Sequence, residues 1–111
     1  ALILTFKILI MSLSAGEVIS LTQAQSLTDE FKKNFGTEQG YLVDSLLIKS
    51  ILDQEGCEGI RIYNGYDIDS GERNLVLVGV DESEKDLANG VILDKLAKCP
   101  SHCDSASPLY F

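Results

Sequence analysis

Basic side chains are scarce in this sequence, with nine Lys and Arg residues against seventeen Asp and Glu residues and a net charge of −8. A chain with this balance repels a phosphate backbone and lacks the counterion release that drives nucleic-acid binding. We therefore expect no nucleic-acid partner. The one acidic run, DESEKD at 81–86, lacks the central glycine and terminal glutamate of an EF-hand calcium loop. We expect this run to be a solvated surface.

Linkers, internal repeats and low-complexity tracts are also missing. Because no tract rich in Pro, Gly or Ser divides the chain, we expect residues 11–111 to form a single α+β domain. The longest apolar run, ALILTFKILIM at 1–11, is too short to span a bilayer as a helix. No membrane partner is expected.

The apolar segment at 1–10 has three interpretations. It is upstream sequence that precedes a native start at Met11, a truncated secretory signal, or an edge strand with alternating apolar side chains. As a signal it lacks a basic leading segment, and a cleavage after Ala15 would place the large Leu13 at the −3 position. We expect a cytoplasmic protein, or a secreted or periplasmic one if the segment is a signal.

Two amphipathic helices are expected in the first half of the chain. Ser20 and Gln23 have the spacing of a capping box, and apolar residues follow at steps of three and four until Gly36. A second helix is expected within 41–56, with Asp44 or Ser45 as its N-cap and a broader, more buried apolar face.

After Gly59 the apolar period changes from 3.6 to 2, which predicts a half-buried strand from Ile60. The run LVLVGV at 75–80 is apolar on both faces, as in a central strand. A third strand is expected at 90–94, after the turn dipeptide at Asn89. The predicted fold is α+β, with two N-terminal helices packed on a three-stranded antiparallel sheet. We expect the C-terminal tail ASPLYF to cover the other sheet face, with a homodimer or the N-terminal strand as alternatives.

Three blocks of the sequence carry a resemblance. GCEGIRIY, LVLVGVD and CPSHC occur in this order, and the chain resembles a family of small bacterial proteins that share G-C-x-G-I-R-x-Y, L-V-L-V-G-V-D and C-P-x-x-C blocks. The resemblance runs from about Ile19 to Leu109. It implies no particular reaction, and His102 stands where the family pattern tends to have proline or a polar residue.

The cysteines are the residues with the most obvious chemistry, and their odd number weakly favours a reducing compartment. Cys99 and Cys103 could form a disulfide across the Pro100 turn, or either could be a nucleophile activated by His102. Zinc could bind Cys57, Cys99, His102 and Cys103, although ligation by two adjacent side chains is awkward. The simplest interpretation is that the thiols are small packing residues.

A polar row is predicted on the first strand, where Arg61, Tyr63 and Asp67 share a face by parity. This row could bind a small anion or a partner. In the simpler interpretation it is the solvent face, with Arg61 paired to a cross-strand acid such as Asp81. No glycine-rich phosphate loop is found.

We therefore expect a binding or interaction protein for a small molecule or another protein, monomeric or homodimeric. A thiol-dependent enzyme or a structural zinc site is the alternative. We expect no cofactor unless the cysteines and His102 bind zinc.

Overall fold

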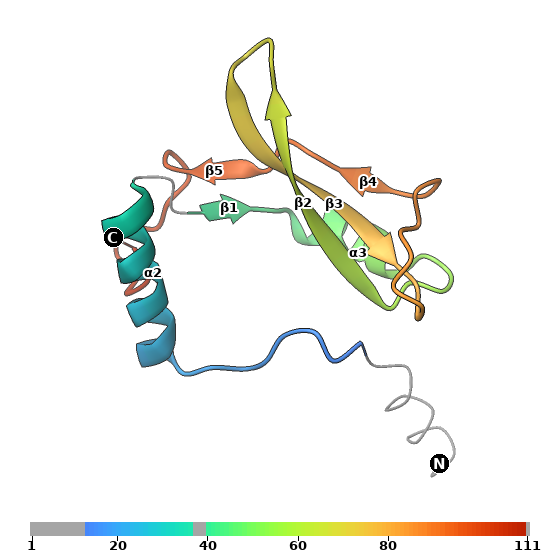
Figure 1. Ribbon diagram of the computed structural model, residues 1–111, viewed down its shortest axis with the longest axis horizontal. Helices are drawn as coiled ribbons and strands as arrows, with labels where there is room; N and C mark the ends of the chain where they lie inside the picture. Colours follow the sequence, from blue (N-terminus) through green and yellow to red (C-terminus); the bar gives the residue numbers. More distant parts are fainter. Residues whose placement is uncertain (1–12, 37–39, 111) are drawn as a thin grey trace. The chain divides into compact units, whose positions relative to one another are not determined.

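A computed structural model describes residues 13–36 and 40–110 and has an α+β fold, as predicted (Figure 1). Its contacts divide the chain into two compact units. One unit holds Asp44–Lys95 with the described residues 13–15, and the other holds the described residues within 16–43 and 96–110. The three interpretations of the segment at 1–10 concern residues outside the described ranges. The single domain over 11–111 stays a prediction.

The described elements follow one another in this order: α2 (Leu21–Phe35), β1 (Gly40–Leu42), α3 (Ser45–Leu52), β2 (Gly59–Asp67), β3 (Glu72–Val80), β4 (Ile92–Leu93) and β5 (Ala97–Cys99).

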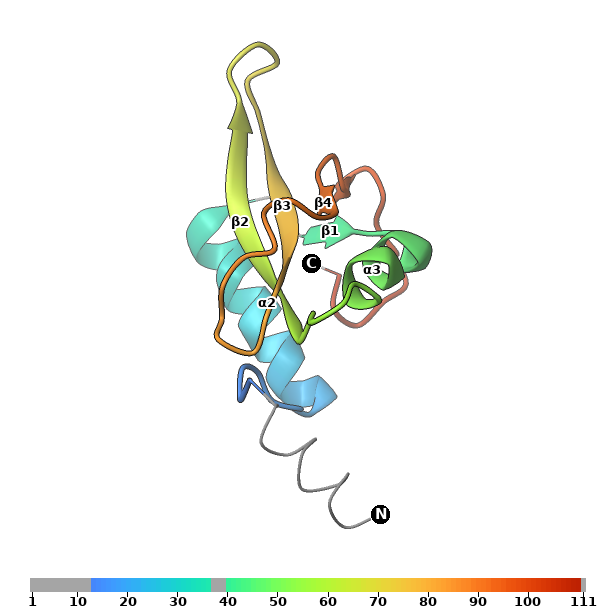
Figure 2. The same cartoon turned by 90° about the vertical axis from the view of Figure 1, so that its right-hand side faces the viewer.

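The first unit is built on a long antiparallel hairpin of β2 and β3, visible in both views of the ribbon (Figures 1 and 2). The register runs from Gly59 opposite Val80 to Asp67 opposite Glu72. β4 pairs with β3 only at Leu77 and Val78, which gives the sheet order β2-β3-β4. The predicted central strand is therefore confirmed, and the third strand is shorter than the expected 90–94.

Helix α3 packs on this sheet. Asp44 is its N-cap and accepts a hydrogen bond from Leu46 N at 2.7 Å, as one of the two expected caps. Ile51 is fully buried, and its Cγ2 atom lies so close to Gly79 that a Cβ there would be 3.2 Å away. Ile51 is the one buried residue of this helix. Leu46 and Leu47, on the same predicted apolar face, are exposed.

The predicted N-cap of this helix at Asp44 or Ser45 is confirmed, whereas its predicted end at Gly56 is too late. No strand was predicted before the cap. Gly40–Leu42 is instead strand β1, which pairs with β5 from Gly40 opposite Cys99 to Leu42 opposite Ala97. The helix ends at Leu52, before Gly56. A three-residue strand carries too little periodicity to be recognised in the sequence, since it depends on a partner far along the chain.

The second unit contains α2, β1, β5 and the C-terminal tail. The predicted capping box is confirmed: Gln23 N donates to Ser20 Oγ at 3.1 Å, and Ser20 N donates to Gln23 Oε1 at 2.9 Å. Gln25 Nε2 donates to Pro108 O at 3.1 Å and ties the tail to α2.

The assignment of both helices to the three-stranded sheet needs correction, because α2 belongs to the unit of β1 and β5. An apolar stripe indicates that a helix packs against another element, but it does not indicate which element that is. That the tail covers the sheet stays a prediction. Within the described ranges, neither helix is long and apolar enough to cross a membrane.

Candidate functional site

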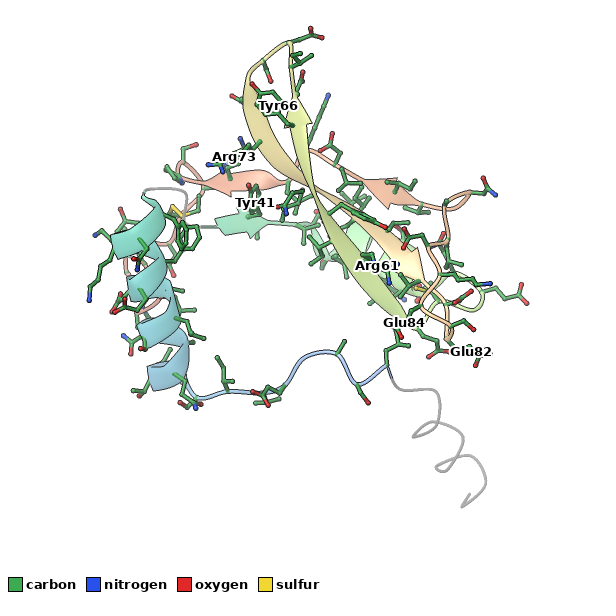
Figure 3. The ribbon with its side chains drawn as sticks, in the orientation of Figure 1. Tyr41, Arg61, Tyr66, Arg73, Glu82 and Glu84 are labelled. Atoms are coloured by element: carbon green, nitrogen blue, oxygen red, sulfur yellow. A yellow bond between two sulfur atoms is a disulfide. The ribbon has the colours of Figure 1, made fainter. Side chains whose placement is uncertain are left out.

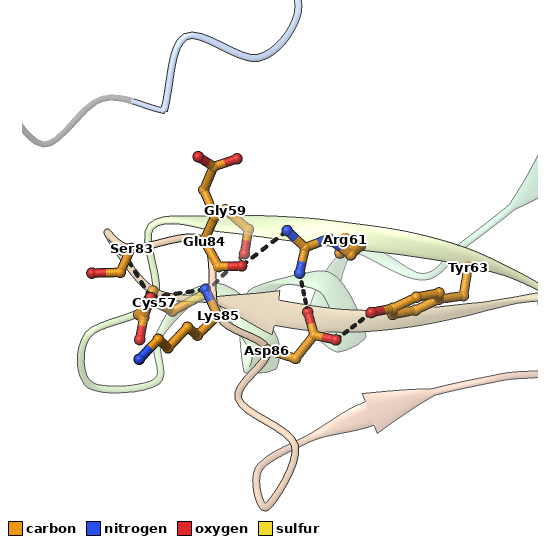
Figure 4. Close-up of polar contacts among 9 residues, drawn as sticks. Cys57, Gly59, Arg61, Tyr63, Ser83, Glu84, Lys85 and Asp86 are labelled. Carbon is orange, nitrogen blue, oxygen red and sulfur yellow. Dashed lines mark hydrogen bonds and ion pairs between the residues drawn. The ribbon is translucent and has the colours of Figure 1, made fainter.

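The polar face of β2 carries a cluster centred on Asp86 (Figure 4). Arg61 Nη1 donates to Asp86 Oδ1 as an ion pair, and the Tyr63 hydroxyl donates to Asp86 Oδ2. Arg61 Nη2 also donates to the backbone oxygen of Glu84 at 3.0 Å. The register places Arg61 and Tyr63 on the same face of the strand, two residues apart, so both side chains reach the same carboxylate.

The loop that presents Asp86 is folded by Asp81. Its Oδ1 atom accepts hydrogen bonds from Ser83 N at 2.8 Å and from Lys85 N at 3.0 Å. Glu84 has a φ of 63°, which turns the chain back, and Asp86 forms a bridge with Val80 at the end of β3. The acidic run at 81–86 is therefore an ordered loop whose last carboxylate faces the sheet.

The cluster shifts the titration of its members. The hydrogen bond from Tyr63, followed by the hydrogen bond and positive charge of Arg61, lowers the pKa of Asp86. The hydrogen bond to Asp86 raises the pKa of Tyr63, and burial and the carboxylate charge add to this effect. The bond to Asp86 likewise raises the pKa of Arg61. Asp86 is thus held ionised and neutralises the Arg61 charge.

This pairing changes the expected partner of Arg61. The sequence suggested Asp81, whereas the structure pairs Arg61 with Asp86. Asp81 instead uses its carboxylate to fold the loop. Because the guanidinium already binds a carboxylate and a carbonyl, the cluster holds the loop against β2 and offers little free positive charge to an anion.

Asp67, the third residue of the predicted polar row, lies apart from this cluster at the end of β2. Its Oδ1 atom accepts hydrogen bonds from Asp69 N at 2.9 Å and Ser70 N at 3.4 Å, which lower its pKa. Gly71, with a φ of 71°, completes the turn into β3. Asp67 therefore shapes the tip of the hairpin.

The cysteines fall into different parts of the chain. Cys99 and Cys103 form a disulfide with a Cα–Cα distance of 4.8 Å, so neither sulfur is a thiolate in this form. Cys57 is partly buried in the other unit, where its Sγ donates to Gly59 O at 3.3 Å. His102 N lies between the two cysteines and donates to Lys98 O, one residue before Cys99, at 2.8 Å. In the part of the chain that the structure describes, no group of three or more His, Cys, Asp or Glu residues is placed to hold a metal ion.

An open depression of about 360 Å³ lies beside α3, lined by Gln54, Glu55 and the segment 86–90. Gln54 is already engaged there: its Oε1 accepts from Val91 N at 2.8 Å, and its Nε2 donates to Ile51 O at 3.0 Å. The Gln54 amide therefore holds Val91, the residue that follows the lining segment 86–90.

The outer edge of β2 is a feature that the sequence reasoning missed. Leu87 N donates to Gly79 O at 2.8 Å, so the backbone groups of Gly79 point away from β2. Val80 O accepts instead from Glu58 N at 2.8 Å, on the β2 side. Successive residues of a strand direct their backbone N–H and C=O groups to opposite edges. The backbone groups of the even-numbered residues of β3 therefore point toward β2.

The register pairs the even-numbered residues of β3 with odd-numbered residues of β2. The backbone groups of the even-numbered residues of β2 are therefore directed outward, away from β3. These residues are Ile60, Ile62, Asn64 and Tyr66. In the described chain, β2 forms a ladder with β3 alone. The side chains of Ile62 and Tyr66 are 58% and 66% exposed, and Tyr66 lies toward the hairpin tip in Figure 3. The alternation after Gly59 indicated a strand, but not that this strand would be at an edge.

Comparisons with known proteins return no relative. No protein-family model matches the sequence, no curated protein matches it significantly, and no solved structure matches the fold significantly. The resemblance drawn from the three sequence blocks stays a prediction.

Proposed function

We propose that the protein is a binding module that takes up an extended polypeptide segment at the outer edge of β2. The observation that carries this proposal is the row of outward N–H and C=O groups on Ile60, Ile62, Asn64 and Tyr66. An added strand satisfies such groups by continuing the ladder, and its alternate side chains give specificity. An open edge is otherwise a liability that proteins cover or charge.

The side chains along the edge favour an apolar partner strand. Ile62 and Tyr66 lie on one face of β2, both exposed, and neither carries a charge. A partner with apolar residues at alternate positions would pack against them while its backbone bonds to β2. The cluster of Arg61, Tyr63 and Asp86 supports this use from the opposite face, because it holds the loop at 81–86 on the sheet.

The thiol-dependent alternative places its chemistry at Cys99 and Cys103. These sulfur atoms are joined in the described form, so that alternative requires a reducing step before either can act as nucleophile or zinc ligand. The edge of β2 needs no such step.

Selection of peptides on the intact protein tests the proposal. A displayed library of random nonapeptides is selected on the wild-type protein, and the enriched peptides are measured against Asn64→Pro. Proline removes one outward N–H and is tolerated at an edge strand. We expect enriched peptides with alternating apolar residues, and at least a tenfold loss of binding to Asn64→Pro.

Ile62→Lys is the companion variant, because it keeps every backbone donor and changes only the side chain. It should also weaken binding, since an edge lysine opposes strand addition. Circular dichroism and thermal unfolding confirm that both variants fold. Peptides that bind Asn64→Pro and Ile62→Lys as well as the wild type would reject the β2 edge as the site.

A further inference from the structure

We infer that the strand added at the β2 edge is β2 of a second copy of this chain. The inference rests on the proposed binding function and names its partner. Two β2 strands would run antiparallel about a two-fold axis at Asn64, with Asn64 opposite Asn64 of the second copy. The result is a continuous six-stranded sheet, three strands from each copy, in which neither β2 edge stays open.

The backbone of β2 permits this register. Asn64 is one of the even-numbered residues whose N–H and C=O groups point outward, so it can exchange two hydrogen bonds with its counterpart. The next outward residues then pair as Ile62 with Tyr66 of the second copy, and Tyr66 with Ile62 of the second copy. All of these are donors and acceptors that β3 leaves unused.

The side chains favour this register over its neighbours. Ile62 and Tyr66 are both exposed, and the two-fold axis brings them together twice on one face of the sheet. An axis at Tyr63 would instead set Ile62 opposite the amide of Asn64. The self-complementary order of one apolar residue, one amide and one aromatic residue therefore selects Asn64 as the centre.

Charges on the opposite face agree with the same register. Arg61, which stays bound to Asp86 and Glu84 O, falls opposite Asp67 of the second copy, so the register brings no like charges together. Tyr63 falls opposite the small Gly65 of the second copy, which leaves room for its ring. Two chains of net charge −8 repel each other, so the pairing should strengthen as salt screens that repulsion.

Cross-linking through Asn64→Cys tests the register directly. The variant also carries Cys57→Ser, so that the free thiol of Cys57 cannot form a cross-link. Reductant is omitted to keep the Cys99–Cys103 disulfide. In the inferred dimer the two introduced cysteines face each other at a Cα distance of about 5.5 Å, which a disulfide accepts. We expect a covalent dimer on mild oxidation, and a mass of twice 12.1 kDa for the wild type by light scattering at high concentration.

Tyr66→Cys in the same Cys57→Ser background is the matched control. The axis at Asn64 separates the two copies of residue 66 by about 13 Å along the strands, too far for a disulfide. Equal cross-linking of both variants, or a monomeric wild type at every concentration and salt level, would overturn the inference. If peptides sensitive to Asn64→Pro are then still selected, the binding module stands and its partner is another polypeptide. If none is selected, the proposed function fails as well.

Discussion

Gly79 shows how little room the core of the first unit has. A Cβ built there would lie 3.0 Å from Cys57 Sγ, 3.1 Å from Gln54 Nε2 and 3.2 Å from Ile51 Cγ2. These atoms come from α3 and the turn after it, so Gly79 is where the helix approaches the central strand. Cys57 accordingly contributes to packing at this point, the simplest role expected for it from the sequence.

Gly79→Ala should lower the free energy of unfolding by about 1–3 kcal/mol, because overpacking a buried site forces its neighbours to move. Urea unfolding measures the loss. Gly65→Ala is the control, since its Cβ would meet Asn74 O and Val76 Cγ2 at an ordinary 3.5 Å. Adding Cys57→Ala to Gly79→Ala should recover part of the loss. Equal effects at Gly65 and Gly79 would show that the close approach is unimportant.

At the scale of the element, α2 depends on local capping. The reciprocal bonds of Ser20 and Gln23 satisfy donors at its N-terminus, and Lys32 and Lys33 lie in its last turn. Ser20→Ala should therefore cost about 1 kcal/mol in the free energy of unfolding, measured by urea denaturation with circular dichroism.

Ser26→Ala serves as the control for that prediction. Ser26 is exposed in the interior of the same helix, where alanine is the better helix former, so this change should be neutral or slightly stabilising. A loss at Ser26 as large as that at Ser20 would contradict a capping role.

The elements that could be predicted are those whose causes lie close together in sequence. The cap at Ser20 depends on a residue three positions away, and the cap at Asp44 on one two positions away. The central strand at 75–80 was recognisable because burial on both faces makes every residue apolar. Strands β1 and β5 could not be recognised in the sequence, since each is three residues long and forms only by pairing with the other.

The site was predictable only in part, for a related reason. Parity placed Arg61 and Tyr63 on one face, but which acid they meet depends on how the loop at 81–86 folds. That fold rests on the bonds to Asp81 and on the positive φ of Glu84, which composition does not reveal. The Cys99–Cys103 disulfide was one of several open alternatives, because spacing alone does not decide between bridge, ligand and packing.

For the whole molecule, acid should reduce stability through Asp86 and Asp67. Both carboxyl groups have a pKa below their ordinary value of 3.8 in the folded chain, Asp86 through Tyr63 and Arg61 and Asp67 through the turn amides. The unfolded chain therefore binds more protons in acid. The stabilisation is complete above the unfolded pKa and is lost as the pH falls through the folded pKa values.

Thermal unfolding of the wild type and Asp86→Asn from pH 7 to pH 2.5 measures this effect. At pH 7 the wild type should have the higher Tm, because Asp86→Asn replaces the carboxylate that binds Arg61 and Tyr63. As the pH falls below 3.8 and through the lower folded pKa of Asp86, the two Tm values should converge, since protonation removes the same charge from the wild type. Repeating the scan in about 0.5 M NaCl screens the net charge, which changes sign near the pI of 4.4. A Tm difference that stays constant across the pH range would show that Asp86 does not stabilise the fold through its charge.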